Sequence, residues 1–564
     1  MLVPVDLSRF VPGVVTLGHY ERPWLRGDLL AGVTVAAYLV PQVLAYAGLA
    51  GLPPVAGLWA AVPALVAYAL LGTSRLLSAG PESTTALMTA VVIGPMAAGD
   101  PARYAMLAAA LGLAVGAWCL VARLLRLGFI ADLLSRPTLV GYLAGVALIM
   151  MVSQLGKLTG VEVDGDKFFG ELASFVRGLG SLDWATTGFA AAVLVFLFGV
   201  QRLAPRLPGP LLAVLLATGA VAVFGLDRYG IAIIGEIPSG IPAPVFPDLA
   251  LFRDLLLPAV GVLLVGYTDT ILTARAFAER GKGGRIDANQ ELVALGVANI
   301  GAGFFRGLPV SSSGSRTALA DAAGARSQLH SLVTAAIVVA TLLFLGPLLT
   351  RFPAPALGAI VVYAAVRLID IDGFRRLARF RRNEFLLALA AMVGVLVFDI
   401  LQGVLLAVAL SVAELLFRAA RPHDAVLGLV PGLAGMHDVD DYPQAHTIPG
   451  LLVYRYDSPL FFANAENFRR RALSAVTEQK DPVAWFVLNT EANVEVDITA
   501  LDAVERLRLE LERRGIVFAL ARVKQDLLDD LEKFGLAQKI GPEHIFPTLP
   551  TAVAAYEKWR SLRF

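Results

Sequence analysis

The sequence predicts a polytopic α-helical membrane domain followed by a soluble α/β domain, and three observations support this fold class. First, only 16% of the 564 residues are charged and 57% are hydrophobic, whereas a soluble chain has about 25% charged residues. Second, apolar runs of roughly 17–22 residues, the length that crosses hydrocarbon, recur from Asp28 to Arg418. Third, charges become dense after Arg421. We therefore expect an N-terminal segment (1–27), a transmembrane domain (28–420), a linker (421–436) and a soluble domain (437–564).

Composition excludes several classes of function. The net charge of +1 gives no general attraction to nucleic acid. The single cysteine, Cys119, can form neither an internal disulfide nor a cysteine metal cluster. The first twenty residues lack a basic stretch followed by a continuous apolar stretch, so we expect no cleaved signal peptide. We find no nucleophile–base constellation and no Gly-rich phosphate loop with an adjacent lysine, so we expect neither an enzyme nor an ATP-driven pump.

Fourteen membrane segments are expected within the transmembrane domain. They begin near Asp28, Val55, Ser83, Arg103, Pro137, Ala185, Gly209, Leu255, Gln290, Ser313, Ser327, Pro353, Glu384 and Gln402. With the N-terminus in the cytoplasm, most basic residues between segments fall on the inner side, as the positive-inside rule requires. These inner residues include Arg206, Arg280, Lys282, Arg285, Arg367 and the arginines from Arg375 to Arg382. The even number of segments then predicts a multi-pass protein of the cell membrane with both termini in the cytoplasm.

Two short motifs indicate an internal repeat. "STTAL" begins at Ser83, and "SRTAL" begins 232 residues later at Ser315. Each follows a polar or Gly/Pro-rich stretch, and each is the third segment in a set of seven. Seven is odd, so the two repeats (about 28–226 and 254–420) have opposite orientations in the membrane. Matching interrupted segments in two inverted halves are the best sequence pointer to a transporter site.

Two half-helices that begin near the middle of the membrane favour an anion between them. Each N-terminus presents unpaired N–H groups and the positive end of the helix dipole. Hydroxyl groups add donors, and Arg316 adds a full positive charge that a bound anion would compensate. The alternative is that Arg316 pairs permanently with Glu82 or Asp269, or extends outward. The expected anion-binding residues are Gln42, Ser83, Thr84, Ser313, Gly314, Ser315 and Arg316.

Acidic residues at membrane depth suggest a coupling site. Asp269 and Thr273 lie four residues apart in "TDTILT", on one side of a helix. A carboxylate, a hydroxyl and freed carbonyl groups can bind Na⁺, or the carboxylate can carry H⁺; the alternative is charge compensation of Arg316 alone. Glu82 is the third coupling candidate, and its alternatives are a helix-dipole role or neutrality. We expect Pro41 to break the first segment and free carbonyl groups beside Gln42.

Three stretches resemble the sulfate permease (SulP) family of anion transporters over nearly the whole chain. They are "VAAYLVPQVLAYAGLAGLPPVAGLWAA", "DANQELVALGVANIGAGFFRGLPVSSSGSRTALADAAGARSQL" and "VYRYDSPLFFANAENFRRRA". The resemblance implies two inverted repeats of seven segments in a uracil-permease-like fold, with a core domain that moves against a gate domain in an elevator-type mechanism. It places the anion between the third and tenth segments, with Gln42, Ser83, Ser315 and Arg316 in the site. "TDTILT" is similar to the Na⁺ site of the sodium–bicarbonate branch, whereas Glu82 departs from the family, in which this residue is often small or apolar.

The soluble domain is similar to a STAS domain. "LLVYRY", "WFVLN" and "IVFALA" are predicted strands, and helices are predicted for "AENFRRRALSAVTEQ", "ITALDAVERLRLELERRG" and "VKQDLLDDLEKFG". In related regulators the turn before the second helix carries a phosphorylated Ser or Thr, and Thr499 occupies that turn. We favour the alternative that Thr499 simply caps or begins the helix.

The expected function is secondary transport of sulfate or a similar inorganic oxyanion, coupled to H⁺ or Na⁺ or driven by exchange. A Na⁺-dependent bicarbonate or dicarboxylate transporter on the same scaffold is the alternative. We expect no cofactor other than a coupling ion at Asp269 and Thr273, and no other metal. The expected partners are the anion, the lipid bilayer, a second copy in a homodimer, and a cytoplasmic protein at the STAS domain. A membrane-anchored signalling protein is a third reading, but a mere anchor needs no interrupted helices.

Overall fold

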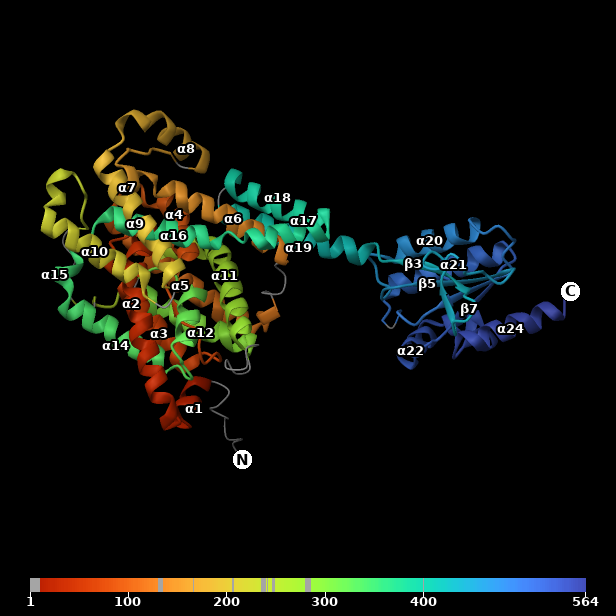
Figure 1. Ribbon diagram of the computed structural model, residues 1–564. Coiled ribbons are helices and arrows are strands. Elements are labelled where there is room, and N and C mark those ends of the chain that lie inside the picture. The colour runs from red at the N-terminus through yellow and green to blue at the C-terminus, as the bar shows by residue number, and fades with distance from the viewer. Residues whose placement is uncertain are drawn as a thin grey trace. The chain divides into compact units, whose positions relative to one another are not determined.

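The computed structural model describes residues 11–129, 135–165, 167–204, 207–234, 240, 242–245, 249–278, 286–398, 400–493 and 495–563. The chain divides into two compact units, Met1–Ser411 and Val412–Phe564. The first unit is helical, and the second is an α/β domain (Figure 1). The loop residues Arg206, Arg280, Lys282 and Arg285, which we assigned to the inner side, lie outside the described residues.

For every predicted membrane segment, a helix begins within two helical turns of the predicted first residue. These helices are α2 (Leu25–Leu49), α3 (Val55–Leu71), α4 (Ser83–Ala97), α5 (Pro101–Leu124), α6 (Arg136–Ser153), α9 (Trp184–Leu203), α10 (Gly209–Phe224), α11 (Leu249–Ala278), α12 (Ala288–Phe304), α13 (Gly314–Ala322), α14 (Leu329–Phe344), α16 (Ala354–Leu368), α18 (Arg382–Phe398) and α19 (Ile400–Ala420). Shorter helices are α1 (Pro12–Gly18), α7 (Leu155–Thr159), α8 (Phe168–Arg177), α15 (Gly346–Leu349) and α17 (Ile371–Phe380). Among the described residues, six helical stretches are long and apolar enough to cross a membrane, and four shorter helices are also apolar. The number of crossings stays a prediction.

Packing separates most of these helices into two sets. In the first helix set (α2–α5 and α11–α14), α12 packs along α3 and α5, and α14 packs along α2 and α3. In the second helix set (α6, α7, α9, α10, α16 and α18), α6 packs along α18 and α16, and α9 packs along α16. Helix α2 contacts α10 and α16, and α4 contacts α16. On the side of the first set, α2 and α4 therefore form the main boundary with the second set.

Glycines allow close contacts between helices. A Cβ atom built on Gly141 of α6 would lie 1.9 Å from the carbonyl oxygen of Ala388 in α18. A Cβ atom built on Gly57 of α3 would lie 2.0 Å from the carbonyl oxygen of Val43 in α2. Small residues are favoured between membrane helices because they let the backbones approach closely.

The predicted break at Pro41 is wrong. Helix α2 continues through Pro41 to Leu49. Proline removes one backbone donor, but a helix packed on several sides can tolerate that loss. Most of α2 from Val35 to Leu49 is buried, so packing holds this helix together.

Two short strands connect the interrupted segments. Strand β1 (Ala79–Gly80) pairs in antiparallel fashion with β2 (Ser311–Ser312), so that Ala79 lies opposite Ser312 and Gly80 lies opposite Ser311. Helix α4 begins three residues after β1, and α13 begins two residues after β2. The strand pair therefore fixes the starting points of the two half-helices relative to each other.

The second unit contains a six-stranded sheet in the order β4-β3-β5-β6-β7-β8. Its strands are β3 (Asp424–Leu429), β4 (Met436–Asp438), β5 (Leu451–Tyr456), β6 (Trp485–Asn489), β7 (Val517–Ala521) and β8 (Ile545–Phe546), and its helices are α20 (Ala465–Thr477), α21 (Ile498–Arg513), α22 (Gln525–Phe534), α23 (Leu536–Ile540) and α24 (Leu549–Ser561). Strands β5 to β8 are parallel, whereas β3 is antiparallel to both β4 and β5. Figure 1 shows helices on both faces of this sheet.

The side chains of strand β5 alternate between the two faces of the sheet, and each face has its own hydrophobic cluster. Successive side chains of a strand point to opposite faces. Leu452, Tyr454 and Tyr456 of β5 join one hydrophobic cluster, and Leu451 and Val453 join another. The three predicted strands and three predicted helices of this unit are present. The segment 421–436 is not a simple linker, because β3 belongs to the sheet.

Candidate functional site

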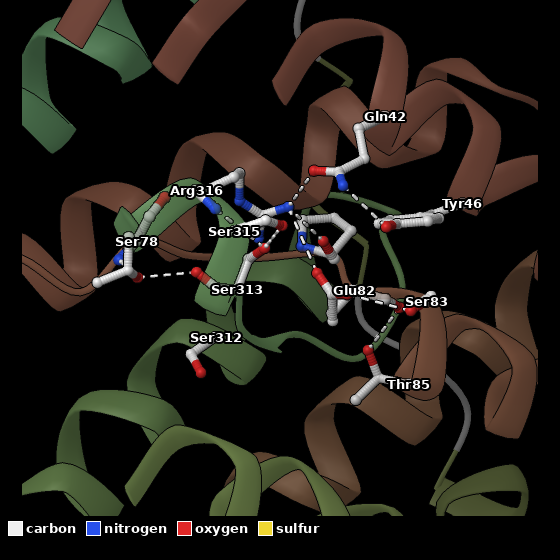
Figure 2. A network of polar contacts seen from close by, with 12 residues as sticks. Gln42, Tyr46, Ser78, Glu82, Ser83, Thr85, Ser312, Ser313, Ser315 and Arg316 are labelled. Atoms are coloured by element: carbon white, nitrogen blue, oxygen red, sulfur yellow. Dashed lines mark hydrogen bonds and ion pairs between the residues drawn. The ribbon is translucent and has the colours of Figure 1, made fainter. Parts of the chain in front are cut away.

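The two half-helices are tied together by hydrogen bonds beyond the strand pair. The backbone N–H of Ser313 donates to the carbonyl oxygen of Ser78 at 3.0 Å. The backbone N–H of Ser78 donates to Oγ1 of Thr317, in the first turn of α13, at 3.1 Å. Figure 2 shows this connection beside the residues that precede α4. The segment before α4 and the start of α13 therefore form one hydrogen-bonded unit.

The half-helix N-termini differ in their caps. Ser313 caps α13, and its hydroxyl accepts from the backbone N–H of Arg316 at 3.5 Å. Glu82 occupies the cap position of α4, but its side chain accepts no capping hydrogen bond from that helix. Instead, its Oε1 accepts from the Ser83 hydroxyl at 3.0 Å. The first turn of α4 thus keeps backbone donors that its own cap does not use.

A cavity of about 270 Å³ lies where the half-helices meet the second helix set. From the first set it is lined by the predicted residues Gln42, Glu82, Ser83, Thr84, Asp269, Gly314 and Ser315. From the second set it is lined by residues of α6 and α16, including Tyr142 and Arg367. The structure therefore brings most of the predicted site residues together around one cavity, at the boundary between the two sets.

Arg316 lies behind the wall of this cavity. Its side chain is fully buried and does not line the cavity. Its Nη1 donates to Oε1 of Gln42 at 3.1 Å and to the carbonyl oxygen of Pro81 at 3.0 Å. The same nitrogen lies 3.7 Å from Oε2 of Glu82 (Figure 2). The structure thus contains the pairing with Glu82 that we gave as an alternative, and no outward extension of Arg316.

Gln42 connects the hydrogen bonds of Arg316 to a side chain that lines the cavity. Its amide nitrogen donates to the Tyr46 hydroxyl at 2.9 Å, and both residues line the cavity. The amide therefore uses its acceptor on the arginine and its donor on a tyrosine. In this way the position of the buried guanidinium fixes the orientation of a lining side chain.

The two acidic candidates have different surroundings. Asp269 is half-buried and lines the cavity, and its Oδ2 accepts from the Ser312 hydroxyl at 3.4 Å. Among the described residues, no cation forms an ion pair with Asp269, which argues against permanent pairing with Arg316. Thr273 does not line the cavity, although its hydroxyl lies 3.9 Å from the position of a Cβ atom built on Gly314. No group of three or more His, Cys, Asp or Glu side chains that could hold a metal occurs in the described part of the chain.

The sequence missed one charged lining residue, Arg367. We assigned it to an inner loop, but it lies in the last turn of α16 and lines the cavity. Its Nη1 donates to the Tyr363 hydroxyl at 3.4 Å, and its guanidinium lies 5.7 Å from the centre of the Tyr363 ring. The available signal was its position within the apolar run "AIVVYAAVRL" rather than after it.

Thr499 lies in the first turn of α21 and is exposed. The cap is Asp497, whose Oδ1 accepts from the backbone N–H of Ala500 at 2.8 Å. Thr499 therefore begins the helix and does not cap it. Its phosphorylation stays a hypothesis.

Known proteins match this chain along its whole length. The Sulfate permease family profile matches residues 25–391, and the STAS domain profile matches residues 442–552. A probable sulfate transporter of Mycobacterium tuberculosis strain H37Rv is 59% identical over 560 residues, which cover 99% of this chain and 100% of that protein.

Solved structures share the fold. The murine Solute Carrier 26 family member A9 anion transporter, in the inward-facing state, matches with a TM-score of 0.89 at 24% identity and covers 98% of this chain and 95% of that chain. The transmembrane domain of the cyanobacterium bicarbonate transporter BicA matches with a TM-score of 0.59 at 24% identity and covers 70% of this chain and 98% of that chain. The predicted fold class, a helical membrane protein with a C-terminal STAS domain, is confirmed. The matched family consists of transporters and not of enzymes, as the sequence predicted. The chain belongs to the sulfate permease family.

Proposed function

We propose that this chain is a secondary transporter of sulfate or a similar inorganic oxyanion, and that the anion binds in the cavity between α4 and α13. The observation that carries this proposal is the β1–β2 pair, which fixes two helix N-termini at one cavity. The name of the Mycobacterium tuberculosis relative supports sulfate as the substrate.

The chemistry of the cavity suits an oxyanion. Two helix N-termini contribute partial positive charge and backbone donors. The hydroxyl groups of Ser83, Thr84 and Ser315 line the same cavity. The buried Thr268 hydroxyl also lines it and has no hydrogen-bond partner within the described part of the chain. Since a liquid water occupies about 30 Å³, the cavity has room for a tetrahedral oxyanion and several waters.

The arrangement of helices supports alternating access of the elevator type. The half-helices and α2 belong to the first helix set, while α6 and α16 close the cavity from the second set. Sliding of one set past the other would expose the cavity first on one side of the membrane and then on the other. The β1–β2 pair lies within the first set, so this movement leaves it intact.

Charge balance supports coupling to a cation, either H⁺ or Na⁺. Glu82 and Asp269 are the acidic lining residues, and the guanidinium of Arg316 lies beside Glu82. A like charge about 6 Å from the bound anion would cost about 3 kcal/mol at an effective dielectric constant near 20. Protonation of Asp269 removes that cost, so the proton and the anion would enter together. Na⁺ at Asp269 and Thr273 would have the same electrostatic effect.

A Na⁺-dependent bicarbonate or dicarboxylate transporter is the second candidate function. The observation that favours it is Asp269, which lines the cavity and accepts a hydrogen bond from the Ser312 hydroxyl. The cavity volume excludes neither a planar anion nor a small dicarboxylate. The fold similarity to BicA is compatible with this candidate but does not select it.

We place the protein in the cell membrane with both termini in the cytoplasm, because basic residues of the loops gather on one side of the predicted segments. We also retain a homodimer and a cytoplasmic partner of the STAS domain as proposals. Pull-down of a partner by the full chain, and its loss when residues 421–564 are deleted so that β3 and β4 are removed with the rest of the sheet, would test the second of these.

Uptake of radiolabelled sulfate into proteoliposomes tests the function, with pH and Na⁺ gradients imposed separately. We expect uptake driven by an inward H⁺ gradient, and competition by unlabelled oxyanions. Ser83→Ala and Ser315→Ala should weaken uptake because both hydroxyls line the cavity. Ser153→Ala is the matched control, since the Ser153 hydroxyl donates to the carbonyl oxygen of Met150 in its own helix. Absence of sulfate flux under both gradients, with bicarbonate or dicarboxylate flux present, would replace the first candidate by the second.

A further inference from the structure

The connection between α16 and α18 is a separate short helix, α17. Helix α16 ends at Leu368, and Asp370 then caps a new helix, with its Oδ1 accepting from the backbone N–H of Gly373 at 2.7 Å. Helix α18 follows at Arg382. A capped helix of ten residues between two apolar helices is therefore an ordered part of the fold.

One face of α17 packs against the protein. The Phe374 ring meets the Phe385 ring of α18 edge to face, with 6.4 Å between their centres. Leu377 joins a hydrophobic cluster with Val140 of α6 and Ala388 of α18. This face already has its partners.

The opposite face carries arginines. Arg375, Arg376 and Arg379 are exposed and line a shallow surface depression with Asp372 and Phe380. Arg381 and Arg382 follow and are exposed as well. We call these five arginines, three on α17 and two directly after it, the arginine face.

Little negative charge balances the arginine face. Arg375 lies 3.2 Å from Asp372, but the two side chains are 67% and 92% exposed, so water screens this pair. Among the described residues, no carboxylate lies within ion-pair distance of the other four arginines. Like charges one helical turn apart repel each other, so an external anion would stabilise this surface.

Helix α18 shows at which depth the arginine face lies. Leu386, Leu389, Val393 and Val397 are 57%, 36%, 46% and 45% exposed and follow one another at intervals of three or four residues, so they form one apolar stripe. The stripe begins four residues after Arg382, which corresponds to about 6 Å along a helix. The headgroup layer of a bilayer is about 5–7 Å thick on each side of the hydrocarbon. If lipid tails cover the stripe, Arg382 at the start of α18 reaches the level of the phosphates. Helix α17 packs on this end of α18 through Phe374 and Phe385, so its arginines lie at a similar level.

We propose that the arginine face of α17 binds the phosphate headgroups of anionic phospholipids at the membrane surface. Guanidinium groups suit phosphate because they donate two parallel hydrogen bonds to its oxygens. Ile371 and Phe380, which are 56% and 68% exposed, lie on either side of the arginine row by the helical period and would enter the glycerol region. This site is independent of the proposed transport function.

Native mass spectrometry of the purified full chain tests the proposal. The probes are short-chain phosphatidylglycerol and a phosphatidylcholine with the same acyl chains. The variant Arg375→Gln/Arg376→Gln/Arg379→Gln should bind phosphatidylglycerol about 100-fold more weakly at low ionic strength, since each arginine near an anionic surface contributes about fivefold. Arg506→Gln/Arg513→Gln/Arg560→Gln is the matched control, with the same change of charge at exposed positions of the second unit.

Two more variants keep the test decisive. Arg375→Lys/Arg376→Lys/Arg379→Lys keeps the charge but loses the paired hydrogen bonds, so it should bind more weakly than the parent and more tightly than the glutamine variant. Arg376→Glu changes a single exposed side chain, so it should fold normally and weaken binding at least about tenfold. Equal binding of phosphatidylglycerol and phosphatidylcholine by the parent chain would overturn the proposal. So would unchanged binding by the folded glutamine variant or by Arg376→Glu; an acidic protein surface would then be the better occupant.

Discussion

Replacement of Arg316 by glutamine should damage the site mainly by leaving Glu82 without a counter-charge. At 3.7 Å and an effective dielectric constant near 20, the two charges attract each other by about 4 kcal/mol. The substitution also removes the donor to the carbonyl oxygen of Pro81 and to Oε1 of Gln42. Breaking a buried pair typically costs about 3–5 kcal/mol, so we expect the thermal midpoint of Arg316→Gln to fall clearly below that of the parent.

The effect on the anion follows from the same charges. For an anion bound about 6 Å from Glu82, an unbalanced carboxylate would cost about 3 kcal/mol, which is roughly a 100-fold increase in KM. Arg316→Gln/Glu82→Gln removes both charges together. Because Arg316 does not line the cavity, the double variant should regain a KM within about tenfold of the parent and most of the lost stability.

Sulfate uptake in proteoliposomes and thermal unfolding of four proteins, namely the parent, Arg316→Gln, Glu82→Gln and the double variant, complete a double-mutant cycle. Arg351→Gln, at an exposed position, controls for the loss of one arginine. If the double variant transports as poorly as Arg316→Gln, the reasoning is refuted. The guanidinium charge would then act on the anion directly, as the sequence alone suggested.

Three further predictions concern other residues. Arg367→Gln should raise the KM for sulfate about fivefold with an unchanged thermal midpoint, because this exposed side chain lines the cavity; an unchanged KM would remove Arg367 from the site. Gly141→Ala should lower stability by about 1–3 kcal/mol, because its Cβ atom would lie 1.9 Å from a backbone oxygen. Gly188→Ala, with nothing within 4 Å, should be neutral in the same thermal unfolding assay, and equal effects of the two would contradict the packing argument. In the STAS domain, the hydrogen bond from Arg508 lowers the pKa of Glu505. The ionised Glu505 should therefore stabilise the folded domain at pH values above its unfolded pKa of about 4.3, and this contribution should disappear as the pH falls through the folded pKa. Glu505→Gln should therefore increase hydrogen exchange in α21 at pH 7 but not at about pH 3; a pH-independent difference would contradict this.

The sequence was most informative where local rules act alone. Apolar run length predicted where the helices begin, and the matching "STTAL" and "SRTAL" motifs predicted that two short segments meet. The β1–β2 pair shows that they do meet. Gln42, Ser83 and Ser315 all line the cavity, the two serines because a residue at a half-helix start has few other places to point. Their role in anion binding stays a prediction.

The rest depended on packing between distant segments. A charge count cannot tell that Arg316 turns back toward Gln42 and Pro81 and away from the cavity. Arg367 looks like a loop residue until α16 is placed against α2 and α9. Strand β3 was missed because it is held by pairing with β5, whose first residue lies 22 positions after the end of β3.

The hydrogen bonds that join Ser78 to Ser313 and Thr317 also have a thermodynamic consequence. Pulling α4 away from α13 would break these hydrogen bonds and the β1–β2 pair in a place without solvent, where each unpaired backbone group costs several kcal/mol. The starts of α4 and α13 form the floor of the cavity. We therefore expect this floor to keep one geometry through a whole transport cycle. A floor of fixed geometry contributes the same intrinsic affinity whichever side of the membrane it faces. The ratio of anion concentrations at equilibrium is set by the driving gradient and the voltage for any such transporter, so the fixed geometry predicts instead that the site binds the anion with similar intrinsic affinity at the outer and the inner face.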